Sequence, residues 1–519
     1  MSSQPTERLR RILEYGVLAV VVVMPTQAGV PLLKLERATV TLTAGDIMVW
    51  MLAAIAFGWW LLGRDRSALQ WPPIHLWLLA VAAVVSAAAW LDPGLGKKEV
   101  LSAAKEVFQW IGFCVATPLV FLNGLSTADA RRRAMTAWVA VTAITVLIAI
   151  VQAAAQSQGV APSWLAATRH FETEPLPVDP ASVVGLFGSR TVYGIYLCLS
   201  LPVVMGLMLG AHGAPARLGL ALVLIVGVAS MALEGPYLAV VVGLCTVGAL
   251  AYTTRPAKTV GVITALTVCA GGLLIGPFRQ EKLAWHLMSE RLVAAEETAG
   301  GDLGPSVAPA DEDLPWVPGE GPESVAGGDE GLEPAPADED LPWVPGEGPE
   351  GEEQPTQKPS THEPPQPSPV RYVSEPVIAQ RYAEWGAAVQ MMGSRTWPVA
   401  AIGAGPGQYQ EAIGGYYLSL PKQGKLEPDF QSQYLVVACE LGLPGLFALV
   451  LYFTGTLQAG RRALAAAAER DRGLLAGLIG AVAAALVVNF AGCPIVRGTS
   501  VTLALVACLI LVQARSSRR

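Results

Sequence analysis

Long apolar runs, separated by short polar segments, recur along most of the chain. A helix needs roughly 20 residues to cross a bilayer, and each run is about that long. The pattern therefore predicts an all-α polytopic membrane protein with about 12 transmembrane helices. Their expected ranges are 15–33, 46–63, 73–91, 104–122, 135–155, 191–210, 217–233, 236–252, 258–277, 433–457, 473–492 and 498–513.

The pattern changes between the ninth and tenth spans, where hydropathy falls over residues 278–432. The sequence therefore predicts a membrane bundle of about nine spans over residues 1–277. A large extracytoplasmic loop follows over 278–432, and about three more spans occupy 433–519. At the break between spans seven and eight, Pro236 excludes one continuous helix, because proline interrupts helices and the joined run would be too long.

Part of the long loop, residues 292–370, has the composition of a disordered acidic insert. Leu292 to Gln357 holds 18 Asp and Glu residues and no Lys or Arg. Within it, the segment Pro309–Glu323 recurs identically as Pro336–Glu350. Such Pro-, Gly- and acid-rich repeats bury no core, so we expect a solvated tether. The tryptophan in each copy keeps open an alternative role as a docking arm for a partner.

Composition and charge agree with a membrane protein. Hydrophobic residues make up 52% of the chain and charged residues 15%, whereas a soluble domain is typically about a quarter charged. The net charge of −7 comes from the acidic insert, and the remainder of the chain is basic. The seven cysteines lie in or beside apolar runs without a C-x-x-C pair, so we expect packing residues and no metal site. Membrane lipids are expected partners, and nucleic acid is not.

The distribution of Lys and Arg predicts the orientation. If the N-terminus is cytoplasmic, the inside segments hold 18 Lys and Arg, and the short outside segments hold 8. Both termini are therefore predicted to be cytoplasmic, with the long loop outside. The first apolar run follows Arg8, Arg10 and Arg11 without a convincing cleavage site, so we expect it to be retained as a span.

After the acidic insert, the sequence again predicts ordered structure. Residues 381–392 place Tyr382, Trp385 and Val389 at helical spacing, which predicts an amphipathic helix near the membrane surface. The glycine-rich run 402–409 lacks the Lys-Ser/Thr and the preceding strand of a phosphate-binding loop. It therefore predicts a tight backbone turn, whose exposed N–H groups could line a polar site.

Several motifs, in their order along the chain, resemble those of bacterial O-antigen ligases and the related O-antigen polymerases. The motifs are Gly185–Leu197, the series Arg381…Trp385…Gly403-Ala-Gly-Pro-Gly-Gln-Tyr409, Gln431–Leu435 and Glu440–Leu446. The resemblance implies a glycosyltransferase of the inner (cytoplasmic) membrane of a bacterium that uses no metal and no cofactor. It would take a glycan from an undecaprenyl-diphosphate carrier on the outer side and pass it to a hydroxyl of a glycan or glycolipid acceptor. Polysaccharide-assembly proteins are further possible partners.

The chain departs from this family pattern at two positions. Gln431-Ser432 stands where the family has His-Asn, and Glu234 stands where the family has an outer-turn arginine. Glutamine cannot act as a general base, and a glutamate repels phosphate. The expected chemistry still needs a base for the acceptor hydroxyl and a cation for the diphosphate.

Few residues are candidates for these two tasks. Arg190, Arg381 and Arg395 are the candidate diphosphate-binding residues, because the guanidinium fork matches phosphate oxygens. The alternative for each is a solvated arginine at the membrane surface, and this alternative is favoured for Arg395. Glu234 is a candidate base if it is buried, and Gln431 occupies the position of the family histidine.

Three functions remain open on the sequence alone. The first is a transferase of lipid-linked glycans. The second is a non-catalytic relative that binds a lipid-linked glycan or acts as a scaffold in polysaccharide assembly. The third is a transporter, which is less favoured because the spans hold few ionisable groups and no repeat of spans is evident.

Overall fold

A computed structural model of the chain describes part of the sequence. The described residues are 4–26, 29–35, 38–62, 69–90, 97–157, 186–187, 190–232, 244–249, 377–394, 401–409, 432–490, 492–493, 495 and 499–516. The chain divides into two units, and all of these residues belong to the unit formed by Met1–Ala284 and Glu375–Arg519. The acidic insert and the predicted span 258–277 lie outside the described residues. The predicted span 236–252 is described only at 244–249, which are helical.

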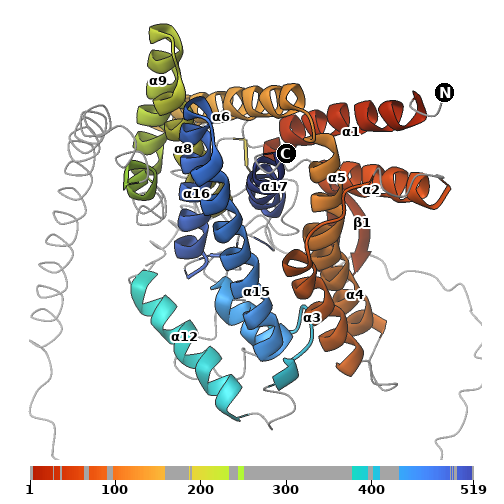
Figure 1. Ribbon diagram of the computed structural model, residues 1–519. Coiled ribbons are helices and arrows are strands. Elements are labelled where there is room, and N and C mark those ends of the chain that lie inside the picture. The colour runs from red at the N-terminus through yellow and green to blue at the C-terminus, as the bar shows by residue number, and fades with distance from the viewer. Residues whose placement is uncertain are drawn as a thin grey trace, which may run out of the picture. The chain divides into compact units, whose positions relative to one another are not determined.

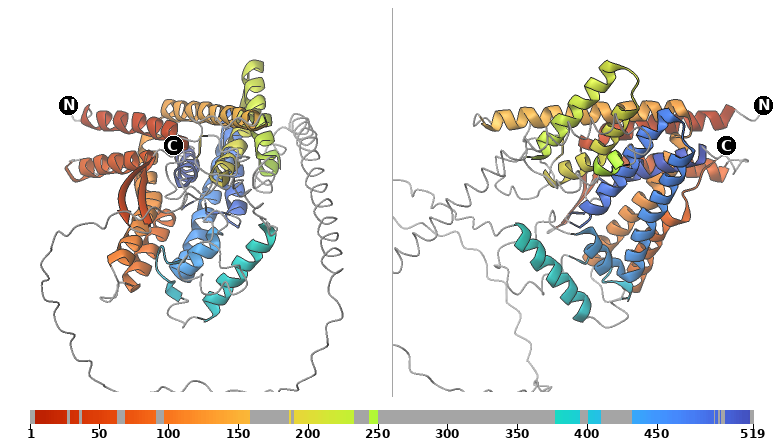
Figure 2. Two further views of the ribbon diagram at one scale, coloured as in Figure 1. Left: turned by 180° about the vertical axis from the view of Figure 1, so that it is seen from behind. Right: turned by 60° about the vertical axis from the view of Figure 1, so that its left-hand side comes forward.

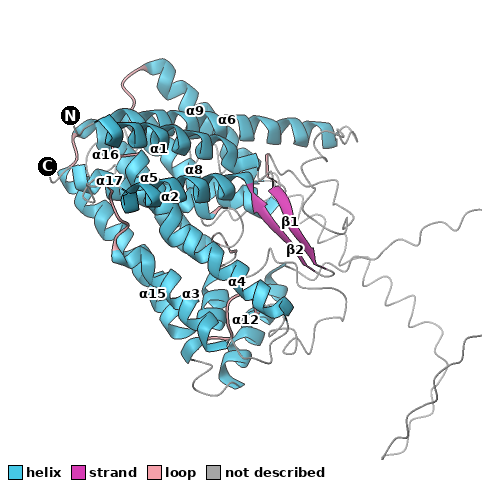
Figure 3. Cartoon of the chain, turned by 90° about the vertical axis from the view of Figure 1, so that its right-hand side faces the viewer, coloured by secondary structure: helices cyan, strands magenta, loops and turns pink. Residues whose placement is uncertain are grey.

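The described residues form α-helices and one short hairpin (Figures 1 and 3). The helices are α1 (Gln4–Val23), α2 (Ala44–Leu62), α3 (Ile74–Trp90), α4 (Lys97–Ile111), α5 (Thr117–Gly124), α6 (Ala128–Ser157), α8 (Arg190–Gly210), α9 (Ala214–Ala232), α12 (Val377–Ser394), α15 (Gln433–Ala466), α16 (Glu469–Val488) and α17 (Ser500–Ser516). A 3₁₀ turn, η1 (Met24–Thr26), follows α1, and a π-helix, η3 (Gly112–Ala116), joins α4 to α5. Strands β1 (Gly29–Leu35) and β2 (Ala38–Thr43) pair antiparallel.

Six of the described helical segments are long and apolar enough to cross a membrane. They are Ala44–Leu61, Ala103–Gly124, Ala128–Gln152, Val192–Gly210, Gln433–Ala466 and Glu469–Val488. Three shorter apolar helices, α3, α9 and α17, coincide with further predicted spans. By helix length and hydropathy, the chain is therefore a multi-pass membrane protein.

The first predicted span is wrong over its second half. The helix that begins at Gln4 ends at Val23, and residues 29–35 form a strand instead of continuing to residue 33 as helix. Pro25 and Pro31 explain the difference, because proline has no N–H to donate to a helical hydrogen bond. The β-branched residues of β2 then favour the extended conformation, and the hairpin leads the chain into α2.

Close contact between helix backbones holds α8 against α16, which lie side by side in Figures 1 and 2. A Cβ atom added to Gly477 would lie 2.7 Å from the Pro202 carbonyl oxygen and 2.9 Å from the Val203 Cα. A Cβ added to Gly473 would lie 2.9 Å from the Gly210 amide nitrogen. Glycines at these positions let the two backbones approach, as in other membrane helix pairs.

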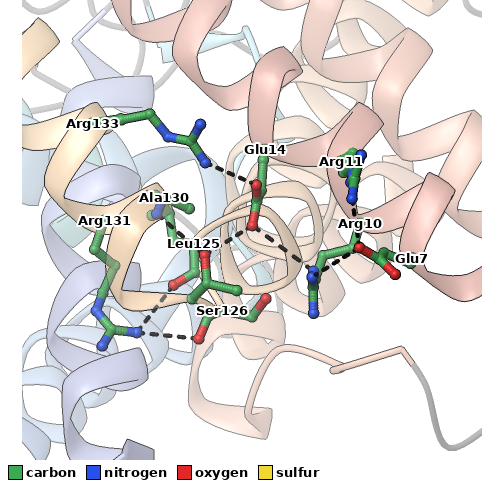
Figure 4. Close-up of polar contacts among 10 residues, drawn as sticks. Glu7, Arg10, Arg11, Glu14, Leu125, Ser126, Ala130, Arg131 and Arg133 are labelled. Carbon is green, nitrogen blue, oxygen red and sulfur yellow. Dashed lines mark hydrogen bonds and ion pairs between the residues drawn. The ribbon is translucent and has the colours of Figure 1, made fainter.

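A polar network ties α1 to the turn between α5 and α6 (Figure 4). The Glu14 carboxylate accepts hydrogen bonds from the Thr127 hydroxyl at 2.8 Å and from Arg133 Nη2 at 3.1 Å. Arg131 Nη1 donates to the carbonyl oxygens of Leu125 and Ser126. These arginines lie at the start of α6 (Figure 4), and this part of α6 lies at the same end of the bundle as both chain termini, away from α12 (Figures 1 and 2).

Candidate functional site

The glycine-rich residues 401–409 lie against a break in α15. Gly442 has φ 67° and ψ −166°, which interrupts the helix, and Pro444 follows two residues later. The break leaves carbonyl groups of the preceding turn without helical partners. The loop supplies them, because Ala404 N donates to the Cys439 carbonyl oxygen at 2.6 Å and Gly405 N donates to that of Glu440 at 3.1 Å. The loop therefore completes the hydrogen bonding of the broken helix.

This contact needs glycine on both sides. Gly403 has φ 92°, and a Cβ atom there would lie 2.6 Å from the Gly442 amide nitrogen and collide with the Glu440 carbonyl group. A Cβ on Gly442 would lie 2.7 Å from the Gly403 amide nitrogen. Gly405 and Gly407 also have positive φ, at 95° and 78°. The prediction of a tight turn over 402–409 is confirmed.

Glu440 lies at the centre of this contact. It is 5% exposed and is the only charged residue in the core of the described part of the chain. Tyr409 N donates to Glu440 Oε1 at 3.3 Å, and the Gly407 backbone N–H donates to the same carboxylate. The Ser86 hydroxyl, from α3, donates to the Glu440 carbonyl oxygen at 2.6 Å. A second carboxyl group, that of Glu106 on α4, lies near enough to act on the charge of Glu440.

Helix α12 covers this region through small and apolar side chains. Ala387, Ala388 and Met391 are buried in a cluster with Tyr409 and Val436. The predicted helix at 381–392 is therefore confirmed, and α12 lies beside α15 (Figure 1). Its packing brings the segment after the acidic insert onto the first half of α15.

The start of α15 is bonded to the end of α16. The Gln433 amide nitrogen donates to the carbonyl oxygens of Asn489 at 2.9 Å and Gly492 at 3.1 Å. The Ser432 hydroxyl donates to the Asn489 carbonyl oxygen at 3.1 Å. The Tyr434 hydroxyl donates to the Leu486 carbonyl oxygen at 2.8 Å. These bonds fix the positions of the residues that directly follow Gln431.

The residues predicted from the sequence as site residues are only partly placed. Arg190 is the first residue of α8, and Arg381 lies in the first half of α12. Glu234, Gln431 and Arg395 lie outside the described residues. The roles suggested for all of them stay predictions.

Glu440 was not among the site residues predicted from the sequence. The sequence did contain a signal for it, namely a lone carboxylate in the apolar run of a predicted span. An ionisable residue at such a position costs free energy unless it has a functional role or hydrogen-bond partners. Its partners come from residues 86, 405 and 409, which are far away in sequence, so they could not be identified in advance. Within the described ranges, no three His, Cys, Asp or Glu side chains gather as a potential metal site.

The fold and this site define a multi-pass helical membrane protein with a polar centre at the end of the bundle that α12 covers. No protein-family model matches the chain, and no curated protein matches it. Any further assignment therefore depends on the chain's own residues and motifs.

Proposed function

We propose that the protein is a membrane glycosyltransferase of the O-antigen ligase or polymerase type. It would transfer a glycan from an undecaprenyl-diphosphate carrier to an acceptor hydroxyl. One observation supports this most directly: the loop 401–409, which carries one of the resembling motifs, lies against the first half of α15, which carries two more at 432–435 and 440–446. Motifs separated in sequence that meet in space are expected of a shared site.

The proposal includes a location in the bacterial inner membrane with both termini in the cytoplasm. Arg10 on α1 and Arg131 and Arg133 on α6 belong to the polar network between these helices (Figure 4), at the end of the bundle where Figure 1 marks both termini. An end rich in arginine supports a cytoplasmic side. The glycine loop and α12 lie at the opposite end (Figures 1 and 2). This orientation puts the site on the outer side, where a translocated lipid-linked glycan would reach it.

The reaction makes two demands on the site. The acceptor hydroxyl gives up its proton, and its oxygen bonds to the anomeric carbon of the donor sugar. The carbon–oxygen bond to the carrier breaks, and the diphosphate leaves with the electron pair. We assign the proton-accepting role to Glu440, because it is a carboxylate held in place by backbone N–H groups at the meeting point of the motifs. Arg190, Arg381 and Arg395 remain the candidates for binding the diphosphate.

A second candidate is a non-catalytic relative that binds a lipid-linked glycan or serves as a scaffold for polysaccharide assembly. The specific observation in its favour is that Gln431 and Glu234 replace the family's histidine and arginine. In this alternative, Glu440 serves only to tie the glycine loop to the helix break.

The deciding experiment removes the gene and restores it, and follows both surface polysaccharide and carrier-linked glycan. A transferase predicts that carrier-linked glycan accumulates and surface polymer is lost on deletion. The wild-type gene should reverse both effects. So should Arg217→Ala, a control in which an exposed arginine in the first turn of α9 is removed.

Three variants test the assigned roles in the same strain. Glu440→Gln, Arg190→Ala and Arg381→Ala should each fail to restore the polymer, although the proteins remain in the membrane. Full activity of Glu440→Gln would eliminate the proton-accepting role. An unchanged glycan profile on deletion, in a strain without a second ligase, would reject the transferase and favour the binding protein.

A further inference from the structure

Three aromatic rings, from α12, from α15 and from the turn after α16, lie close together. Phe490, which follows α16, is 54% exposed. The Tyr434 ring of α15 lies 4.7 Å from it, centroid to centroid, and the Trp385 ring of α12 lies 6.3 Å from it. Exposed aromatic faces with fixed neighbours are a common surface for the C–H faces of a ligand ring.

Two amide side chains next to these rings have polar atoms that lack partners. Gln433 and Asn489 are both 0% exposed. Within the described part of the chain, Gln433 Nε2 and Asn489 Oδ1 have no hydrogen-bond partner, and the Tyr434 hydroxyl lies near Asn489 Nδ2. The Tyr434 hydroxyl donates to the Leu486 carbonyl oxygen and is placed to accept a hydrogen bond from the Asn489 side chain. Buried polar groups are nearly always paired, so unpaired ones in a rigid setting indicate a partner that binds there.

The main chain holds both amides in position. Gln433 is fixed at its backbone by two hydrogen bonds and at Oε1 by the Ile495 N–H, at 3.2 Å. Asn489 caps the end of α16, and its carbonyl oxygen accepts from Ser432 and Gln433. Their free amide groups therefore have little freedom to turn toward other partners. A binding site gains affinity when its polar groups are fixed beforehand.

We propose that Trp385, Gln433, Tyr434, Asn489 and Phe490 form a sugar-binding site, called here the aromatic–amide site. One face of a pyranose ring would pack on Phe490, and its hydroxyls would bond to the two amides once the groups that cover these amides move aside. An amide offers both a donor and an acceptor, which matches a sugar hydroxyl that can act as either. The five side chains carry no charge, which favours a neutral sugar unit over the carrier diphosphate. The inference rests on the proposed function and adds to it the residues that hold the glycan.

The test uses the purified full-length protein in detergent. The probe is the oligosaccharide mixture released by mild acid from the surface polysaccharide of the native cells. Binding is followed by saturation-transfer nuclear magnetic resonance and by calorimetry. Two variants remove the site: Phe490→Ala removes the packing surface, and Asn489→Leu replaces the buried amide with an apolar group of similar size.

The expected result is that each variant weakens binding by about tenfold or more, as the loss of a well-made polar or packing contact does. The control is Phe447→Ala, which removes an exposed phenylalanine (64%) from α15 and should leave binding unchanged. Asn489→Leu should also keep or raise the unfolding temperature, because it removes an unpaired buried polar group. A marked loss of stability would show that Asn489 has a structural partner, and this would overturn its role in binding.

The outcomes separate this inference from the proposed transferase. No binding by the wild-type protein, or equal binding by the site variants, overturns the aromatic–amide site, whatever the glycan profile of the deletion strain. Binding that depends on Phe490 and Asn489, together with an unchanged glycan profile on deletion, retains the site and rejects the transferase. Binding that depends on Phe490 and Asn489, together with a changed glycan profile on deletion, supports both proposals.

Discussion

At the scale of single residues, the glycine loop and the helix break fit together through atoms that leave no room for a side chain. Gly403 and Gly442 each have a positive φ, and each would place a Cβ atom against the other's backbone. The atoms that an added Cβ would meet belong to the main chain and not to flexible side chains. The contact therefore cannot adjust to a larger residue without moving α15 or the loop.

We predict that Gly403→Ala destabilises the protein by at least about 2 kcal/mol, from the strained φ and the backbone collision together. The unfolding temperature in detergent, followed by exposure of buried cysteines, measures the change. The matched control is Gly386→Ala in α12, where an added Cβ meets nothing within 4 Å. Alanine favours a helix more than glycine does, so this control should be neutral or slightly stabilising. A stable Gly403→Ala protein would contradict the described contact.

The carboxylate of Glu440 gives a second prediction at this scale. Glu440→Ala should lower stability by about 1–3 kcal/mol, because it leaves the buried Tyr409 N–H without its acceptor. Glu440→Gln keeps an acceptor oxygen at the same place and should cost much less. Equal loss of stability in both variants would mean that the negative charge itself, rather than the hydrogen bond, holds the loop.

At the scale of elements, the apolar runs were sufficient to predict the helices from α2 to α9 and from α15 to α17, because length and hydropathy alone decide whether a segment crosses a bilayer. The end of the first helix was missed because hydropathy does not register Pro25 and Pro31. The break at Gly442 and the π-helix at Gly112–Ala116 interrupt apolar runs without changing their composition, so no periodicity revealed them.

The candidate site was less predictable than the helices. The glycine turn over 402–409 and the helix at 381–392 followed from local sequence, and both are present. Their meeting with Ser86, Glu440 and Asn489 depends on tertiary packing between distant segments, which one sequence does not encode in any local pattern. The arginines proposed to bind the diphosphate were chosen only because a guanidinium group matches phosphate oxygens, and their roles stay predictions.

The contact between α8 and α16 leads to a prediction for elements. Gly477→Val should separate the two helices, because even a Cβ atom would lie 2.7 Å from the Pro202 carbonyl oxygen. We expect a loss of several kcal/mol, on the order of the largest single-residue effects, and a lower yield of folded protein in the membrane. Gly219→Ala in α9, where an added Cβ has open space, is the control and should fold normally. Normal yield and unfolding temperature for Gly477→Val would contradict the close packing.

At the scale of the whole molecule, the two chain units divide the protein by composition. One unit, Trp285–Ser374, holds 20 of the 42 acidic residues in 90 positions, and the other holds every described helix. Both ends of the long loop return to the helical unit, at the segments before residue 285 and after residue 374. A change in the length of the acidic sequence is therefore expected to leave the packing of the helices unaffected.

Deletion of residues 292–357 tests this expectation. The shortened protein should reach the membrane in normal amount and keep the unfolding temperature of the full chain, because the deleted residues lack core-forming side chains. Activity in the glycan-profile assay should also persist. Loss of membrane expression would show that the acidic sequence contributes to folding. Loss of activity alone would indicate that the acidic sequence binds a partner. Substitution of the repeated tryptophans at 316 and 343 would then be the first test of that contact.

The reciprocal packing of Gly403 and Gly442 has a consequence for ancestry. A replacement at either position creates a collision that no replacement at the other can relieve, since both residues already have the smallest side chain. Descendants of a common ancestor that keep this contact must therefore keep both glycines, however far the rest of the sequence diverges. A distant chain that carries a glycine-rich turn and, a few tens of residues later, an acid-x-Gly-x-Pro step inside a membrane helix has the signature by which kinship with this protein can be recognised.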